Sequence, residues 1–233
     1  MAFGYPVLLE LGGRRAVVVG EAAVAAGKVD GLLAAGATVT VVAPGPAAEL
    51  DRLAAEPGVT VRRRGYLPGD LAGAFLCVAG SADPALRSAV AAEARAAGVL
   101  VNVMDDVPNC DFAAPAVVRR GDLVVAVGTG GRAPALASRL RADLGERFGP
   151  EWAELVELVG EVRAATLADL PDLEERASRW RAALDLEELE WLVRTGRRDL
   201  AAERLRARLL AERAGRAEGS GDARLDRAGR EAV

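Results

Sequence analysis

The first half of the chain combines two hydrophobic periods. An apolar, β-branched run at residues 16–20 precedes a helical pattern that ends near Ala35, and a second such run occupies residues 37–43. Strand, helix and strand within about 30 residues form a βαβ unit. Further apolar runs and an alanine-rich helix follow, at residues 59–62, 74–79, 99–103 and 84–97. Because the strands are continuous apolar runs separated by helices, the pattern favours an α/β fold with a parallel sheet covered on both faces, a Rossmann-type domain over residues 1–113.

The pattern changes after this domain. Residues 114–149 contain two apolar runs joined by Gly121-Asp122, which predicts a pair of strands connected by a tight turn. A helix is expected to follow from Pro134 to Phe148. The strands of this small segment would leave an apolar face uncovered, so we expect the segment to mediate dimerisation.

The C-terminal part is entirely helical in its pattern. Over residues 150–213, leucine, valine and tryptophan recur at spacings of three and four, which predicts a helical domain. Trp152, Trp180 and Trp191 are predicted to anchor its core, the usual role of large aromatic side chains. Residues 214–233 contain few apolar side chains and are predicted to be a disordered tail.

Composition narrows the classes of function. The net charge of −4 gives no global attraction for nucleic acid or an acidic membrane. With two cysteines and no histidine, the chain is short of side-chain ligands for a zinc or haem site, so any metal it handles would be coordinated mainly by another molecule. No stretch approaches the roughly 18 apolar residues of a membrane span, and the N-terminus lacks the features of a signal peptide. These observations predict a cytoplasmic protein.

A glycine ends the first predicted strand, where a following helix could bind a pyrophosphate. The dinucleotide fingerprint G-x-G-x-x-G/A appears here as Gly20-Glu21-Ala22-Ala23-Val24-Ala25. The methyl group of Ala22 is expected to crowd the phosphates, and the carboxylate of Glu21 to repel them. Taken alone, the motif is equally compatible with an ordinary turn between a strand and a helix.

Lys28 is the only lysine in a chain that otherwise uses arginine for every positive charge. A bias this strong would be expected to replace a lysine without a role, although a single residue can survive by chance. We favour a specific role, in which the stem packs on the sheet and the ammonium group approaches a phosphate.

Asp105 follows the apolar strand that ends at Val103. It therefore lies at the carboxyl edge of the predicted sheet, where ligands bind in such folds. Aspartate is also common in turns before proline, and Pro108 is close. From these residues alone, a turn-capping role for Asp105 or Asp106 is the stronger interpretation.

Several uncommon blocks occur in one order along the chain. They are Asn102-Val103-Met104-Asp105-Asp106, Cys110-Asp111-Phe112, Pro115, Arg119-Arg120-Gly121-Asp122 and Thr129-Gly130-Gly131. In these blocks the chain resembles the N-terminal module of siroheme synthases, which acts as precorrin-2 dehydrogenase and sirohydrochlorin ferrochelatase. The resemblance covers residues 5–210 and implies a homodimer built from a Rossmann domain, a dimerisation segment and a helical domain.

The resemblance also implies NAD as hydride acceptor. Residues of the first turn and of the loop after the second strand would hold it, namely Gly20, Glu21, Ala22, Ala23, Val24, Ala43, Pro44 and Gly45, with Lys28 as a further candidate. The family usually has three consecutive glycines where this chain has Gly20-Glu21-Ala22, and an arginine where it has Gly27.

For catalysis, the resemblance implies that Asp105 is the general base. A carboxylate at this position can accept the protons released when precorrin-2 is oxidised or when a metal enters the macrocycle. These substrates are polycarboxylates, which arginines can bind in bidentate fashion and backbone N–H groups can cradle. The candidate substrate-binding residues are Asn102, Arg119, Arg120, Thr129, Gly130, Gly131 and Arg132.

We therefore expect an NAD-dependent precorrin-2 dehydrogenase that yields sirohydrochlorin and, as a second reaction, inserts ferrous iron to give siroheme. Two alternatives stay open. One is a metallochelatase acting on sirohydrochlorin that has lost NAD binding, and the other is a non-catalytic tetrapyrrole-binding protein. The departures at Glu21 and Ala22 favour these alternatives, whereas Asp105 favours an enzyme.

Overall fold

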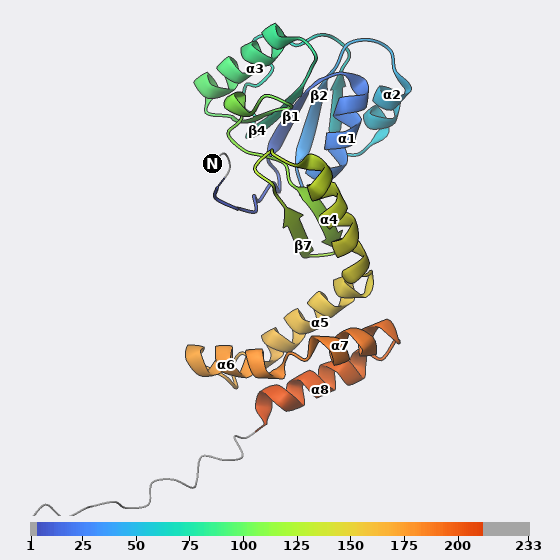
Figure 1. Ribbon diagram of the computed structural model, residues 1–233, viewed down its shortest axis with the longest axis vertical. Helices are drawn as coiled ribbons and strands as arrows, with labels where there is room; N and C mark the ends of the chain where they lie inside the picture. Colours follow the sequence, from blue (N-terminus) through green and yellow to red (C-terminus); the bar gives the residue numbers. More distant parts are fainter. Residues whose placement is uncertain (1–3, 212–233) are drawn as a thin grey trace, which may run out of the picture. The chain divides into compact units, whose positions relative to one another are not determined.

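The computed structural model describes residues 4–211, so the tail predicted over residues 214–233 lies outside the described part (Figure 1). The described chain divides into two compact units. The first contains the residues up to Val117 together with Ala126–Asp143, and the second contains Val118–Val125 together with the residues from Leu144 onward. Each unit is described by itself.

The first unit contains a five-stranded parallel sheet in the order β3-β2-β1-β4-β5. Its elements are β1 (Arg15–Gly20), α1 (Ala22–Leu33), β2 (Thr38–Val42), α2 (Ala48–Ala55), β3 (Val59–Arg62), β4 (Leu76–Gly80), α3 (Pro84–Ala97), β5 (Leu100–Val103) and the 3-10 turn η1 (Val107–Asn109). The expected α/β fold with a Rossmann-type parallel sheet is confirmed. The short helix α2 is an element that the sequence pattern did not predict.

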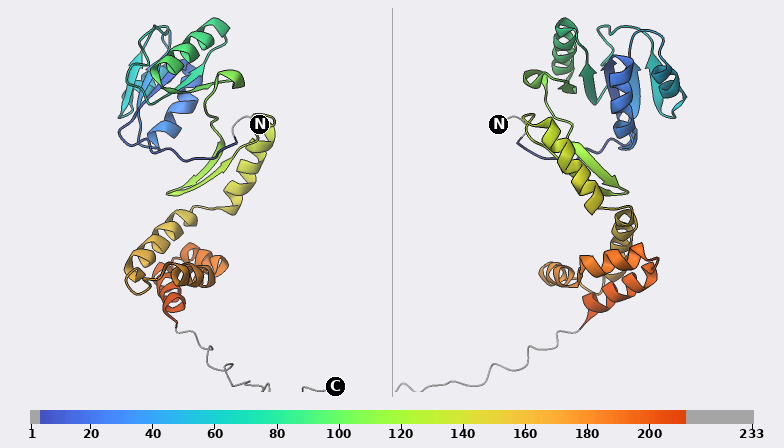
Figure 2. Two further views of the ribbon diagram at one scale, coloured as in Figure 1. Left: turned by 90° about the vertical axis from the view of Figure 1, so that its left-hand side faces the viewer. Right: turned by 45° about the vertical axis from the view of Figure 1, so that its right-hand side comes forward.

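Both faces of this sheet are covered, which explains the continuous apolar strands. Val18 points to the face that α1 and α2 cover, while Val17 and Val19 point to the opposite face, packed with residues of α3. Figures 1 and 2 show the two helical layers on opposite sides of the sheet. The core is built mainly from valine, alanine and leucine, as the composition predicts.

The segment after the sheet forms the expected hairpin and helix. Strands β6 (Ala116–Arg120) and β7 (Leu123–Val127) flank the turn at Gly121, and α4 (Pro134–Arg147) follows. In α4 only Ala137 is buried, whereas Leu136 and Leu140 are exposed. This helix therefore presents apolar side chains that the described chain does not cover.

Four helices complete the second unit, namely α5 (Glu151–Thr166), α6 (Leu173–Ala183), α7 (Leu186–Arg194) and α8 (Arg198–Leu210). Trp152 is buried in their shared core and Trp180 packs against it. The prediction for Trp191 is wrong, because its side chain is 46% exposed and the Arg197 guanidinium stacks on its ring at 3.9 Å. On α7 the buried stripe passes through Leu189, Leu192 and Val193, and Trp191 falls outside it. Within residues 4–211, none of the helices has the length and apolar content needed to cross a bilayer.

Candidate active site

The carboxyl ends of β1, β4 and β5 meet at one edge of the sheet. Gly20 pairs with Gly80, Ala79 pairs with Val103, and the Met104 N–H donates to the Ala79 carbonyl at 2.8 Å. Neighbouring strands lie about 4.8 Å apart, so the residue after Met104 lies roughly 10 Å from the start of α1. The strand order reverses between β1 and β4, the point at which open α/β sheets bind dinucleotides.

The turn from β1 into α1 requires glycine at its first position. Gly20 has φ of +149°, and a Cβ there would overlap the carbonyl oxygen of Gly80. Gly80 is crowded in turn, since a Cβ on it would meet Val24 of α1 and the sulfur of Met104. The two strand ends and the first turn of α1 are therefore in direct contact, and Val24 serves this packing.

The N-terminus of α1 carries no side-chain cap. Glu21 is the N-cap residue, and its side chain makes no capping hydrogen bond. The first-turn N–H groups of Ala22, Ala23 and Val24 have no partner within a helix, and they coincide with the positive end of the helix dipole. This end of the helix is thus suited to an anion.

The two departures from the glycine-rich fingerprint behave differently. Ala22 is half-buried and packs against the core cluster that also contains Ala25 and Val29. Its methyl group therefore has core contacts, and whether it also crowds a phosphate stays a prediction. Glu21 is exposed and forms no ion pair within residues 4–211, so its negative charge is the departure that bears on an anionic ligand.

The loop after β2 borders the same edge. Ala43 is buried and donates its N–H to the Arg62 carbonyl at 3.1 Å, so it belongs to the core. Pro44 and Gly45 are exposed, and a Cβ on Gly45 would meet no atom within 4 Å. Lys28 is half-buried on α1, six residues after Ala22, which places its backbone roughly 9 Å along the helix axis. A contact between Lys28 and a phosphate stays a prediction.

Asp105 is the only non-glycine residue of the described chain with positive φ, at +58°. Its side chain is exposed and makes no hydrogen bond or ion pair within residues 4–211. A left-handed backbone costs an ordinary residue about 1–2 kcal/mol, and such strain is concentrated at functional sites. The carboxylate is therefore free to act on a ligand.

Asp106 takes the structural role that the sequence left open between the two aspartates. Its Oδ2 accepts from Asn109 Nδ2 at 2.9 Å and lies 3.9 Å from Arg87 Nε. These contacts fold the chain into η1 directly after Asp105. The tertiary structure thus separates a tethered Asp106 from an unpartnered Asp105.

The block around Cys110 is structural. The Cys110 sulfur accepts from the Val103 N–H at 3.1 Å, and burial raises the pKa of its thiol, which favours the protonated form. Asn102 Nδ2 donates to the Phe112 carbonyl at 2.8 Å and to the Cys110 sulfur at 3.7 Å. The donor group of Asn102 therefore holds this loop on β5, and a contact between Asn102 and substrate stays a prediction.

The turn before α4 approaches the Asp105 loop. A Cβ on Gly131 would lie 3.6 Å from Val107 Cγ2, and both Gly130 and Gly131 have positive φ. Thr129 Oγ1 accepts from the Ala133 N–H at 3.3 Å, and Arg132 is exposed beside it. The structure thus brings this turn next to the loop that carries the free carboxylate.

Arg119 and Arg120 belong to the second unit. Arg120 donates to the carbonyls of Arg119 and Gly145, each at 3.0 Å, so its guanidinium group connects the hairpin to the end of α4. Arg119 is exposed on β6. A role of these two side chains in substrate binding stays a prediction.

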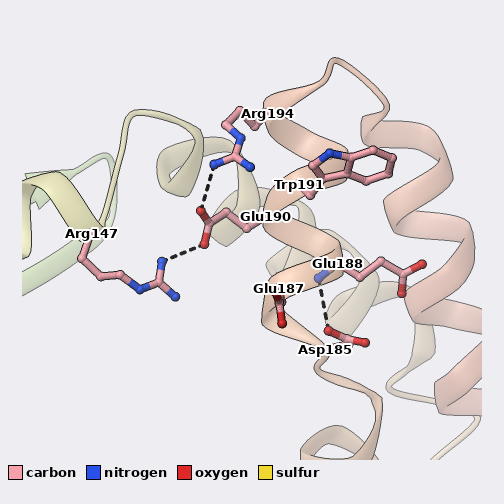
Figure 3. A pocket seen from close by; sticks show the side chains of 7 residues that line it. All are labelled: Arg147, Asp185, Glu187, Glu188, Glu190, Trp191 and Arg194. Atoms are coloured by element: carbon pink, nitrogen blue, oxygen red, sulfur yellow. Dashed lines mark hydrogen bonds and ion pairs between the residues drawn. The ribbon is translucent and has the colours of Figure 1, made fainter.

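The second unit also contains a cavity of about 720 Å³ (Figure 3). Its lining consists of Arg147, Asp185, Glu187, Glu188, Glu190, Trp191 and Arg194. The guanidinium groups of Arg147 and Arg194 both turn to Glu190, at 2.8 and 3.5 Å. The remaining carboxylates leave the lining acidic, which disfavours a polyanionic ligand. Within residues 4–211, no three or more His, Cys, Asp and Glu side chains group to hold a metal ion.

Comparison with known proteins shows what the chain is similar to. Residues 7–116 match the family described as "Putative NAD(P)-binding". The siroheme synthase of Pseudomonas entomophila is 41% identical over 175 residues, and that of Chromobacterium violaceum is 38% identical over 181 residues. These alignments cover 75% and 78% of the chain but only 38% of each relative. Among solved structures, the precorrin-2 dehydrogenase SirC matches with a TM-score of 0.61 and 25% identity, covering 86% of this chain and 98% of its own.

The fold is that of a Rossmann-type α/β protein, the class that contains the dinucleotide-binding domains. Over about three quarters of its length the chain is similar to siroheme synthases, and over 86% of its length it shares the fold of SirC.

Proposed function

We propose that the protein oxidises precorrin-2 to sirohydrochlorin with NAD as hydride acceptor and Asp105 as general base. The observation that carries this proposal is the exposed, left-handed Asp105 at the edge where the strand order reverses. The precorrin-2 dehydrogenase activity of the SirC match supports it. Because the chain spans only 38% of the siroheme synthases it matches, the reaction is proposed for this module alone.

The start of α1 fits the pyrophosphate of NAD. The free N–H groups of Ala22, Ala23 and Val24 would donate to it, and Gly20 allows the close contact with β4 from which α1 starts. Pro44 and Gly45 would border the adenosine end, since they follow the neighbouring strand. Bound NAD would supply the hydride acceptor.

Asp105 would handle the proton. Loss of a hydride from precorrin-2 must be matched by loss of a proton, and an unpartnered carboxylate oxygen of Asp105 can accept it. Asp106 is less suited to this task because Asn109 and Arg87 already occupy its carboxylate. The exposed Arg132 and the N–H groups of the Thr129-Gly130-Gly131 turn, next to this loop, would bind substrate carboxylates.

The experiment is an anaerobic assay of the purified protein with precorrin-2 and NAD, followed by the absorbance of NADH and of sirohydrochlorin. Appearance of both products in equal amounts supports the dehydrogenase.

A second candidate function is supported by the exposed charge of Glu21 at the pyrophosphate position, which disfavours NAD. If no NADH forms but ferrous iron enters added sirohydrochlorin faster than without protein, the metallochelatase is correct. Binding of sirohydrochlorin without either reaction would indicate a tetrapyrrole-binding protein.

The first-turn departures give a direct prediction. Glu21→Gln is expected to tighten NAD binding by up to about fivefold at low salt, because it removes a negative charge beside the pyrophosphate. Ala22→Gly is expected to give no gain, because the alanine methyl group packs on the core. Calorimetric titration of NAD against wild type and both variants checks this. A gain from Ala22→Gly alone would contradict the orientation of its methyl group.

We further propose a cytoplasmic homodimer, assembled through the segment 114–149. The first unit exposes Leu136 (53%), Leu140 (39%) and Val117 (37%), apolar side chains that a second copy would cover. Light scattering at micromolar concentration is expected to give the dimer mass. Replacing Leu136 and Leu140 together by arginine should give a monomer. The matched control, Leu173→Arg on α6, should stay dimeric although Leu173 is 68% exposed.

A further inference from the structure

One arginine contacts both loops that flank the candidate catalytic residue. Arg87 lies on α3 with its side chain only 22% exposed. Its Nη1 donates to the Ser81 carbonyl, in the loop after β4, at 2.7 Å. Its Nε lies 3.9 Å from Asp106 Oδ2, in the loop after β5, and is buried without a hydrogen-bond partner in the described chain.

The backbone at Asp105 depends on what holds its neighbours. A left-handed aspartate persists only where the surrounding structure fixes it. On the N-terminal side, Met104 is fixed by its 2.8 Å hydrogen bond to Ala79 of β4. On the C-terminal side, Asp106 is held by its N–H bond to the Val103 carbonyl at 3.2 Å and by its side-chain contacts with Asn109 and Arg87.

Two arginines of α3 contact this loop from outside it. Arg95 Nη2 donates to the Pro108 carbonyl at 3.2 Å and to Asn109 Oδ1 at 3.0 Å, at the far end of the turn. Arg87 is the one that contacts Asp106, the residue next to Asp105. At 3.9 Å the Arg87–Asp106 pair is an ion pair rather than a hydrogen bond. If the loop moved about 1 Å toward α3, the buried Arg87 Nε would come within hydrogen-bond distance of Asp106 Oδ2.

We infer that Arg87 is a positioning residue for Asp105. Acting through Asp106, it ties the loop after β5 to α3 and to the loop after β4, and so sets the direction of the Asp105 carboxylate. The inference rests on the proposed role of Asp105 as general base. Arg87 itself needs no contact with substrate or cofactor for this role.

The experiment compares kcat and backbone exchange in matched variants. Arg87→Ala is expected to lower kcat by about 10- to 100-fold, the effect of a misplaced catalytic group. The Kd for NAD should stay within about threefold of wild type, because the guanidinium group faces Asp106 rather than α1. Arg87→Lys should recover part of the loss, because the ammonium group restores the charge. Arg52→Ala on α2 is the control: it removes an arginine ion-paired with Asp30 of α1 and with Glu56, and it should keep wild-type kcat.

A double-mutant cycle tests whether the effect passes through Asp106. Asp106→Asn should lower kcat as Arg87→Ala does, and the double variant should be no slower than the worse single variant. Independent losses that multiply would overturn the inference. Amide hydrogen exchange provides a readout without turnover, since residues 104–110 should exchange faster in Arg87→Ala than in Arg52→Ala. Unchanged exchange there would also overturn it.

Two outcomes separate this inference from the proposed function. Wild-type turnover in Asp105→Ala would defeat the role of Asp105 itself. An inactive Asp105→Ala together with a fully active Arg87→Ala would defeat only the positioning role. If Arg87→Ala does not fold, Arg87→Lys and Asp106→Asn carry the test, and wild-type kcat and exchange in Asp106→Asn would overturn the inference.

Discussion

An Asp105→Asn variant is expected to fold as the wild type does and to lose turnover by about 10²- to 10⁴-fold, the range for removal of a general base. Asparagine tolerates the left-handed backbone of this residue and keeps its shape, but its amide cannot accept the proton. Asp105→Gly should be equally inactive and more stable by about 1 kcal/mol, because glycine adopts φ of +58° without strain. If Asp105→Gly is more stable than wild type and also inactive, the wild-type protein retains a strained backbone at this residue because its function needs the aspartate.

Initial rates with precorrin-2 and NAD, together with thermal unfolding of each variant, check this prediction. Asp30→Asn, an exposed aspartate on α1, is the control and should keep both wild-type turnover and wild-type stability. Near wild-type kcat in a folded Asp105→Asn variant would show that another group takes the proton. In that case Asp106, its tethered neighbour, would be the next residue to replace.

The second large effect concerns stability. Gly20→Ala is expected to destabilise the protein by about 3–5 kcal/mol or to prevent folding. The added Cβ would overlap the carbonyl oxygen of Gly80 on the neighbouring strand, and φ of +149° disfavours any side chain. Both strands lie inside the sheet, with partners on either side, so neither backbone can move away without disturbing further pairs.

Gly31→Ala is the matched control for this substitution. Gly31 lies on α1, and a Cβ there would meet no atom within 4 Å. Because alanine favours a helix interior over glycine, this variant should gain about 0.5–1 kcal/mol. Urea unfolding of the two variants beside wild type measures both changes. A Gly20→Ala protein as stable as wild type would mean that β1 and β4 can separate at this edge.

The sheet and its helices could be predicted from the sequence because local pattern carries their information. Continuous valine-rich runs separated by helical periods specify a parallel sheet covered on both faces, whatever the loops do. The core contact of Ala22 is also contained in the local pattern. Ala22, Ala25, Ala26 and Val29 follow the i, i+3, i+4 and i+7 spacing of one buried helix face, and all four pack into the same cluster. In the same way, the spacing of Leu189, Leu192 and Val193 indicates that Trp191 lies off the buried face.

Only the tertiary structure shows that Asp105 and Asp106 have different roles at the site. Asp105 and Asp106 are identical side chains in adjacent positions, and only the folded loop gives one of them positive φ and the other its partners. Arg87 belongs to no motif and lies 19 positions before Asp106, so its contact exists only because α3 packs beside β4 and β5. Backbone strain and long-range ion pairs depend on atoms brought together from distant parts of the chain, and the pattern of a single segment does not contain them.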